Sequence, residues 1–122
     1  MIFQPSSVLE VDFHSINPEP FVSNTVGNTA QTVFGSYTKL RNVILQKTDS
    51  TITYVYIYSK EGSNPTSEDT PKFRFIVKDT APLALYFNQE FVNGISIRAT
   101  SDLNGTTSPT ANTLFVNITY GY

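Results

Sequence analysis

Short segments in which apolar and polar residues alternate recur along the whole chain. In Lys72–Lys78, for example, Phe73, Phe75 and Val77 take every second position. A period of two places alternate side chains on opposite faces of a strand, so each such segment predicts a half-buried β-strand. The segments that predict strands are Val8–His14, Phe21–Val26, Tyr37–Lys47, Thr51–Ser59, Lys72–Lys78, Pro82–Phe87, Gly94–Thr100 and Leu114–Tyr120.

No long segment has the 3.6-residue period of a helix, and Ser, Thr, Asn, Gly and Pro cluster between the strands. We therefore predict an all-β protein, an antiparallel β-sandwich of seven or eight strands with residues 1–122 in one domain. Immunoglobulin-like and jelly-roll sandwiches both fit this pattern. The chain has no Trp and no Cys pair to form an immunoglobulin core, which favours the jelly-roll-like sandwich.

The clearest local prediction is a β-hairpin from Tyr37 to Tyr58, with Asp49 and Ser50 in a tight turn between its strands. Near the other end of the chain, Asp102–Ala111 is rich in turn residues and predicts a flexible loop before the last strand.

The first 30 residues are a candidate extended arm. Pro5, Pro18 and Pro20 interrupt strand pairing, while Ile2, Phe3 and Phe21 are apolar. Two interpretations are equally consistent with this pattern. The segment is either an ordinary edge strand that closes the sandwich, or an arm that docks on a neighbouring subunit by strand addition.

Composition limits the partners. Charged residues make up 15% of the chain and the net charge is −2, so no long-range field attracts nucleic acid or anionic lipid. No apolar stretch approaches the roughly 20 residues that a membrane-spanning helix requires. We expect no nucleic-acid or membrane partner. The chain contains no cysteine, which excludes disulfides and thiolate metal sites.

Residues that carry catalysis are scarce. His14 is the one histidine, and the ten carboxylates are dispersed along the sequence. Nucleophilic catalysis needs a base beside the nucleophile, and glycoside hydrolysis needs two opposed carboxylates. Glu10 and Asp12 share a strand face, although a solvated face has the same appearance. We therefore expect no enzyme, no cofactor and no metal site.

Tyr54, Tyr56 and Tyr58 share one face of a predicted strand, opposite Val55 and Ile57. The simplest interpretation is a cross-strand aromatic ladder in a half-buried sheet. A protein interface is the main functional alternative, because Tyr is enriched in interfaces. A stacking platform for sugar rings is the third.

The C-terminal quarter of the chain resembles a known group of proteins. Its sequence from Phe91 to Thr100 contains Asn93-Gly94-Ile95, a polar loop follows, and the chain closes with the strand Val116–Tyr120. This pattern is similar to the closing hairpin of small β-sandwich virion proteins of tailed bacteriophages. The resemblance implies no catalytic or ligand-binding residues.

From this resemblance we expect a non-enzymatic virion structural protein, with a capsid decoration or cement protein first among the alternatives. Its partners would be the major capsid protein or other virion proteins, and it would form a homo-oligomer, with a trimer favoured. The candidate interface residues are Ile2, Phe3, Phe21, Tyr54, Tyr56 and Tyr58. A neck or tail adaptor and a carbohydrate-binding module are the other expectations.

Overall fold

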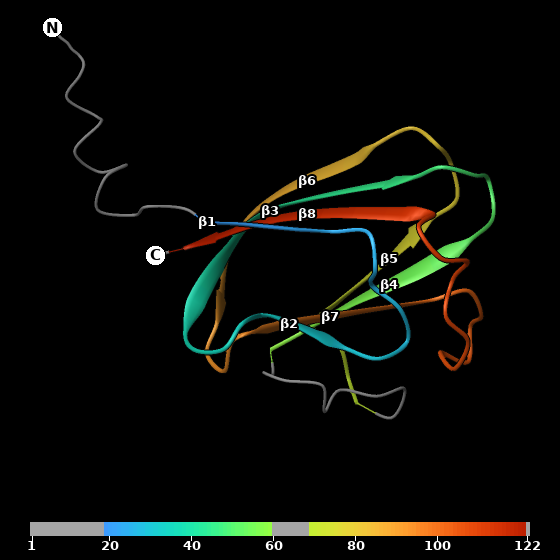
Figure 1. The fold of residues 1–122 in the computed structure, drawn as a ribbon. Coiled ribbons are helices and arrows are strands. Elements are labelled where there is room, and N and C mark those ends of the chain that lie inside the picture. Colours follow the sequence, from blue (N-terminus) through green and yellow to red (C-terminus); the bar gives the residue numbers. More distant parts are fainter. Residues whose placement is uncertain (1–18, 60–68, 122) are drawn as a thin grey trace, which may run out of the picture.

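The computed structural model describes residues 19–59 and 69–121, and these residues form an all-β sandwich without a helix (Figure 1). The strands in chain order are β1 (Glu19–Ser23), β2 (Gln31–Phe34), β3 (Thr38–Lys47), β4 (Thr53–Tyr58), β5 (Phe73–Val77), β6 (Leu83–Phe91), β7 (Ile95–Thr100) and β8 (Leu114–Gly121). They build two four-stranded antiparallel sheets, which confirms the predicted fold class.

The strand order is β1-β8-β3-β6 in the first sheet and β2-β7-β4-β5 in the second. Strands equally far from the middle of the chain pair with each other: β4 with β5, β3 with β6, β2 with β7 and β1 with β8. Two further pairings, β3 with β8 and β4 with β7, join these ladders into sheets. The chain therefore has the pairing pattern of one long hairpin rolled into two layers.

The core lies between the sheets and is formed by the inward-facing positions of the central strands. Val43 and Leu45 of β3, Ile57 of β4 and Ile118 of β8 are each 0% exposed. Burial of aliphatic side chains such as these contributes about 1.5–3 kcal/mol each to folding. The predicted alternation is confirmed in both strands. Ile95, Ile97 and Ala99 of β7 belong to this core, and Phe73 and Phe75 of β5 pack against it.

The predicted hairpin from Tyr37 to Tyr58 is wrong. β3 pairs with β6 and β8 on its two sides, so it has no free edge for β4, which lies in the other sheet. Asp49 and Ser50 also lack the positive φ angles that a two-residue type I′ hairpin turn requires. The connection crosses between the sheets instead. It is fixed by buried Lys47, whose ammonium group donates to the hydroxyls of Thr51 and Thr53.

The expected closing hairpin in the C-terminal quarter is also absent. β7 belongs to the second sheet and β8 to the first, so the two strands face each other across the core and do not pair. The inward positions Ile95, Ile97, Val116 and Ile118 still meet in one core cluster. Alternation predicts which side chains turn inward, but it does not identify the neighbouring strand.

The N-terminal boundary differs from the predicted arm of residues 1–30. Residues 19–30 belong to the sandwich, because β1 pairs with β8 along its whole length and Val26 and Ala30 are buried. Pro20 lies in an edge strand, where the missing amide donor is tolerated. β2 was not predicted, since its four residues are too few to show a period. The predicted strand Val8–His14 lies outside the described residues.

Candidate interaction surfaces

The tyrosine row lies on the outer face of the second sheet, but it is largely covered. Tyr56 and Tyr58 are only 7% and 2% exposed, and Tyr54 is half-buried. A protein interface would need exposed rings, and Tyr56 and Tyr58 do not have them. The cross-strand neighbours of Tyr56 are Arg74 and Arg98, and those of Tyr54 and Tyr58 are not aromatic either, so the register does not form the expected aromatic ladder. Because sugar stacking requires open ring faces, the row does not supply the expected platform.

Arg98 of β7 lies beside this row and explains its burial. The guanidinium group is 1% exposed and lies over the Tyr56 ring, 4.9 Å from its centroid. Its Nε donates to the Tyr58 hydroxyl at 3.0 Å, and both terminal nitrogens donate to the carbonyl of Gly105 at 3.0 Å. One buried cation thus attaches the loop of residues 101–113 to the outer face of the sheet.

A second loop, residues 24–30, is fastened to the first one. Asn28 donates its backbone amide to Ser108 Oγ at 2.9 Å and its side-chain amide to the Thr106 carbonyl at 2.6 Å. Within the longer loop, Asp102 accepts hydrogen bonds from the backbone amides of Thr106 and Thr107. The segment expected to be a flexible loop is therefore tethered at several points.

Acid is expected to loosen these tethers. The Thr107 amide is the main cause that holds the pKa of Asp102 below its ordinary value of 3.8, and the Thr51 hydroxyl similarly lowers the pKa of Asp49. A depressed folded-state pKa stabilises the fold above about pH 4, and this contribution is lost as the pH falls through the lower folded-state value. Unfolding midpoints measured from pH 7 to pH 2 should fall less in Asp102→Asn than in the wild type. Asp79→Asn at an exposed position is the control, and an unchanged profile in Asp102→Asn would contradict the assignment.

The outer face of the first sheet has no such cover among the described residues. Its register places two rows of side chains across all four strands on this face. One row contains Val22, Asn117, Ile44 and Ala84, and the other contains Pro20, Thr119, Asn42 and Tyr86. With Phe115 and Gln46, which oppose each other in the next row, these residues are called the open sheet face below.

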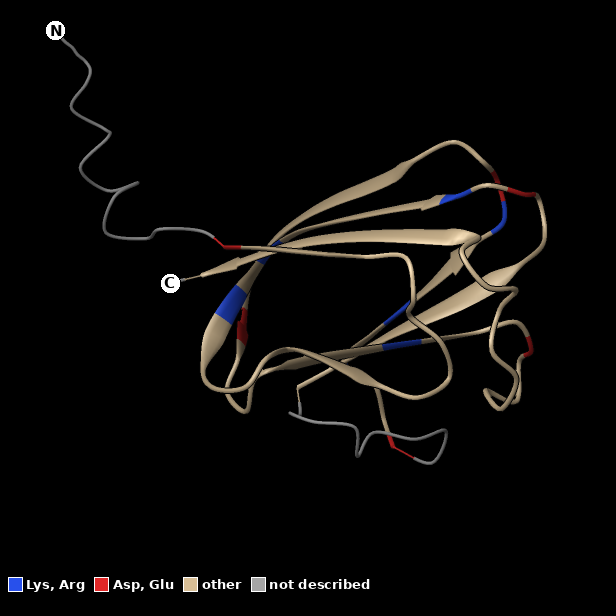
Figure 2. Cartoon of the chain, in the orientation of Figure 1, with Lys and Arg blue, Asp and Glu red and all other residues tan. Residues whose placement is uncertain are grey.

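The open sheet face is exposed, uncharged and rich in apolar groups. Tyr86 is 78% exposed, Val22 72% and Phe115 45%. A shallow hollow of about 230 Å³ lies among Val22, Ile44 and Phe115. β8 carries no charge, and Arg41, at the bulge of β3 beside Asn42, borders the open sheet face and donates to the Asn88 side chain (Figure 2). Depletion of charge in the middle of a patch is typical of the core of a protein interface.

The remaining candidate interface residues do not join the open sheet face. Phe21 is partly buried and packs against the core from β1, so its side chain points opposite to that of Val22. Ile2 and Phe3 lie outside the described residues.

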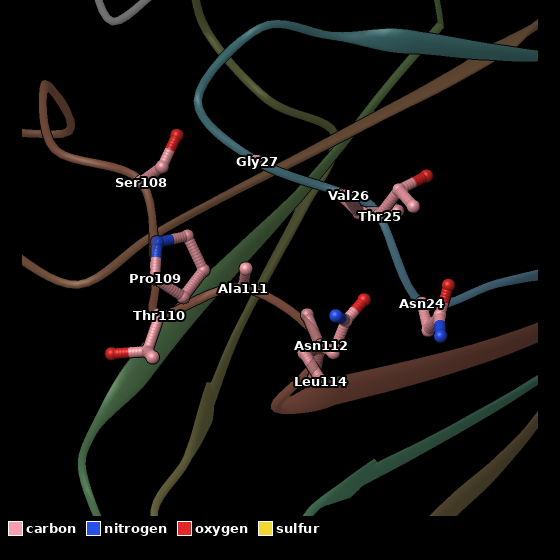
Figure 3. A pocket seen from close by; sticks show the side chains of 10 residues that line it. All are labelled: Asn24, Thr25, Val26, Gly27, Ser108, Pro109, Thr110, Ala111, Asn112 and Leu114. Carbon is pink, nitrogen blue, oxygen red and sulfur yellow. The ribbon is translucent and has the colours of Figure 1, made fainter.

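A cavity of about 210 Å³ lies between the two tethered loops (Figure 3). Asn24 and Thr25 line one side, and Ser108, Thr110 and Asn112 line the other. Its side chains are amides, hydroxyls and apolar groups, so the cavity has no titratable group for acid–base chemistry.

In residues 19–59 and 69–121, no three His, Asp or Glu side chains are grouped so that they could hold a metal ion. No helix able to cross a membrane is found in that part of the chain. His14, Glu10 and Asp12 lie outside it. Comparison with protein-family models, curated proteins and solved structures found no match.

Sequence reasoning missed both Arg98 and the open sheet face. Arg98 alternates with Ile97 and Ala99 as an exposed charge would. Nothing in that alternation shows that the loop after β7 folds back, so that the Gly105 carbonyl accepts from the guanidinium group. A signal for the open sheet face does exist: Leu114, Phe115 and Val116 are consecutive apolar residues, so β8 presents apolar groups to both of its faces.

Proposed function

We propose that this chain is a non-enzymatic virion structural protein of a tailed bacteriophage, a capsid decoration or cement protein. In this role it binds neighbouring capsid subunits and stabilises the head as a homo-oligomer, with a trimer favoured. The open sheet face is the observation that carries the proposal, because an exposed and uncharged four-strand surface is suited to burial against another protein.

The topology supports this proposal. Pairing of β1 with β8, β2 with β7, β3 with β6 and β4 with β5 is the pattern expected when a long hairpin rolls into an eight-stranded jelly roll. Jelly rolls recur in viral capsid domains, although lectins and cupins also use them. Fold alone does not assign function, so the proposal also depends on the surface and on the sequence resemblance of residues 91–122 to phage virion proteins, although β7 and β8 do not form a closing hairpin in this chain.

The interface is expected to exceed about 1,000 Å² of total buried surface, the range of specific protein contacts. The four strands of the first sheet offer a surface for such a contact. Each contact can be modest in affinity, because copies joined in one oligomer bind the shell with avidity. Reinforcement of the shell then follows from bridging adjacent capsid subunits.

A charge placed on the open sheet face should abolish this binding. Phe115→Asp introduces a carboxylate that would be desolvated without a partner in the interface, and we expect at least a tenfold loss of affinity for capsids. Co-sedimentation of the purified protein with capsids that lack it measures the effect. Val92→Asp is the matched control, since Val92 is 65% exposed but lies outside this sheet face. Equal binding by Phe115→Asp and the wild type would contradict the proposed surface.

A neck or tail adaptor is the alternative within the same class, and native mass measurement separates the two. A ring of six or twelve copies would favour the adaptor, whereas three copies would favour decoration of the head. Peptide mass spectrometry of virus particles purified from the source of the gene tests the class itself. Absence of the chain from those particles would overturn the virion assignment.

A further inference from the structure

The cavity between the two tethered loops has an uncharged lining. It measures about 210 Å³ and lies between residues 24–27 of one loop and residues 108–112 of the other (Figure 3). None of the ten described residues that line it is charged. A charged ligand would exchange its hydration for neutral groups without an opposite charge, which is unfavourable. The lining therefore favours a neutral ligand.

Two side-chain amides on opposite sides of the cavity are available to such a ligand. Asn24 lies on one side and Asn112 on the other, and both residues are exposed (Figure 3). Neither amide has a hydrogen-bond partner among the described residues. A side-chain amide offers N–H donors and an acceptor oxygen together, so it can bond to hydroxyl groups in either role.

The same cavity has an apolar part. Val26 and Leu114 are 5% and 3% exposed, and Pro109 is half-buried. Sites for small molecules commonly combine an apolar lining with a few placed polar groups. A ligand that fits this cavity must therefore present both C–H groups and polar groups.

The walls of the cavity are held in place by the fold. The Gly27 carbonyl accepts from the Ala99 amide of β7 at 2.8 Å. Ser108 Oγ donates to Asn28 Oδ1 at 2.9 Å, and a Cβ added at Gly27 would lie 2.8 Å from the same Ser108 oxygen. The two loops thus touch beside the cavity. Because these contacts already order the loops, a ligand loses less binding free energy to ordering them.

Asn112 has a backbone conformation that is uncommon for residues other than glycine. Its φ angle of 61° is the single positive value among the described non-glycine residues. Asn tolerates this region better than most residues, and an uncommon conformation beside a cavity is a reason to look for a function there. Glycine at this position would remove the amide without straining the backbone.

We propose that this cavity binds one neutral sugar unit of a glycan. A pyranose ring carries hydroxyl groups around its rim and C–H groups on its faces. Its hydroxyls can pair with the amides of Asn24 and Asn112 while one face lies against the apolar part. The cavity is smaller than the roughly 300–1,000 Å³ of sites for drug-sized ligands, so it takes a single unit. An apolar peptide side chain would instead leave both amides without replacements for their hydrogen bonds to water.

This site adds a second activity to the proposed function and is separate from it in space. No residue that lines the cavity belongs to the open sheet face. The site also differs from the Tyr54–Tyr58 row, which lies on the other sheet. Variants of the cavity therefore test glycan binding without altering the surface assigned to capsid subunits.

NMR titration of the isotope-labelled full-length chain tests the site. The neutral probes are the methyl glycosides of glucose, galactose, mannose and N-acetylglucosamine. At least one of them should shift the side-chain amide signals of Asn24 and Asn112 saturably, with a dissociation constant of about 1–10 mM. The methyl glycosides of glucuronic acid and N-acetylneuraminic acid should bind more weakly than the best neutral probe. N-acetylglycine methylamide, which supplies peptide groups, should leave these signals unchanged.

Three variants separate the site from a general effect on the fold. Asn112→Gly should weaken binding of the best probe by about threefold or more, because it removes the hydrogen bonds of one amide. It should not lower the thermal midpoint, since glycine favours this φ angle. Adding Asn24→Ala to the same chain should bring the loss to about tenfold or more. Asn104→Ala, an exposed amide of the same loop outside the cavity, is the control and should bind as the wild type does.

The absence of a saturable shift with all four neutral glycosides would overturn the proposal. Equal binding by the double variant and the wild type would do the same, as would tighter binding of an acidic glycoside or of the peptide probe. No capsid takes part in these measurements, so their failure is distinguishable from failure of the proposed function.

Discussion

Replacing Arg98 with alanine is expected to lower the free energy of unfolding by about 3 kcal/mol, a large share of the 5–15 kcal/mol available to a typical domain. The substitution removes both donors that reach the buried Gly105 carbonyl at 3.0 Å, and it also removes the hydrogen bond from Nε to the Tyr58 hydroxyl. An unsatisfied buried polar group costs about 1–3 kcal/mol, and loss of the packed side-chain stem adds to this. Urea unfolding followed by circular dichroism measures the change.

Two companion variants separate packing from hydrogen bonding at this position. Arg98→Met keeps a long stem without donors and should recover little of the lost stability. Arg98→Lys keeps the charge but not the planar fork, so it should recover only part. Lys39→Ala, at a half-buried position on β3, is the control and should change the unfolding free energy by less than about 0.5 kcal/mol. A loss in Arg98→Ala as small as that of the control would contradict the assigned role.

Replacing Gly94 with alanine should have an effect of similar size, about 2–4 kcal/mol. Gly94 has a φ angle of 93°, which L side chains rarely adopt, in the turn between β6 and β7. An added Cβ would also collide with the carbonyl oxygen of Phe34, which is backbone and cannot rotate away. Both effects act where β2 meets the start of β7.

Gly35→Ala is the matched control for this position. Gly35 is exposed, its φ angle is not positive, and it lies on the neighbouring connection. Substitution there should leave the thermal midpoint within about 2 °C of the wild type, whereas Gly94→Ala should lower it by roughly 10 °C or more. Similar midpoints for the two variants would contradict the strain argument.

The sandwich could be predicted because a period of two specifies inward and outward positions locally. Phe73, Phe75 and Val77 turn toward the core as their alternation indicates. Strand pairing could not be predicted in the same way. β3 and β4 are adjacent in sequence and each alternates well, yet the order of the sheets depends on pairings between residues as distant as Val22 and Asn117.

The candidate surfaces were harder to predict because exposure depends on what covers a face. The alternation of β4 predicts that Tyr56 and Tyr58 point away from the core, and both side chains do lie on the outer face of the sheet. They are buried because Arg98 attaches the loop that contains Gly105, an interaction absent from the local pattern of β4. Phe115 and Val22 are exposed for the converse reason, since no described loop crosses the outer face of their sheet.

The central claim is that the open sheet face binds capsid subunits. A cryo-electron microscopy reconstruction of particles purified from the source of the gene tests it most directly. We expect density for the eight-stranded sandwich on the outside of the head, with the β1-β8-β3-β6 sheet and its Phe115 side chain turned toward capsid subunits. Density in which this sheet face points to solvent, or a particle that lacks the chain, would contradict the account.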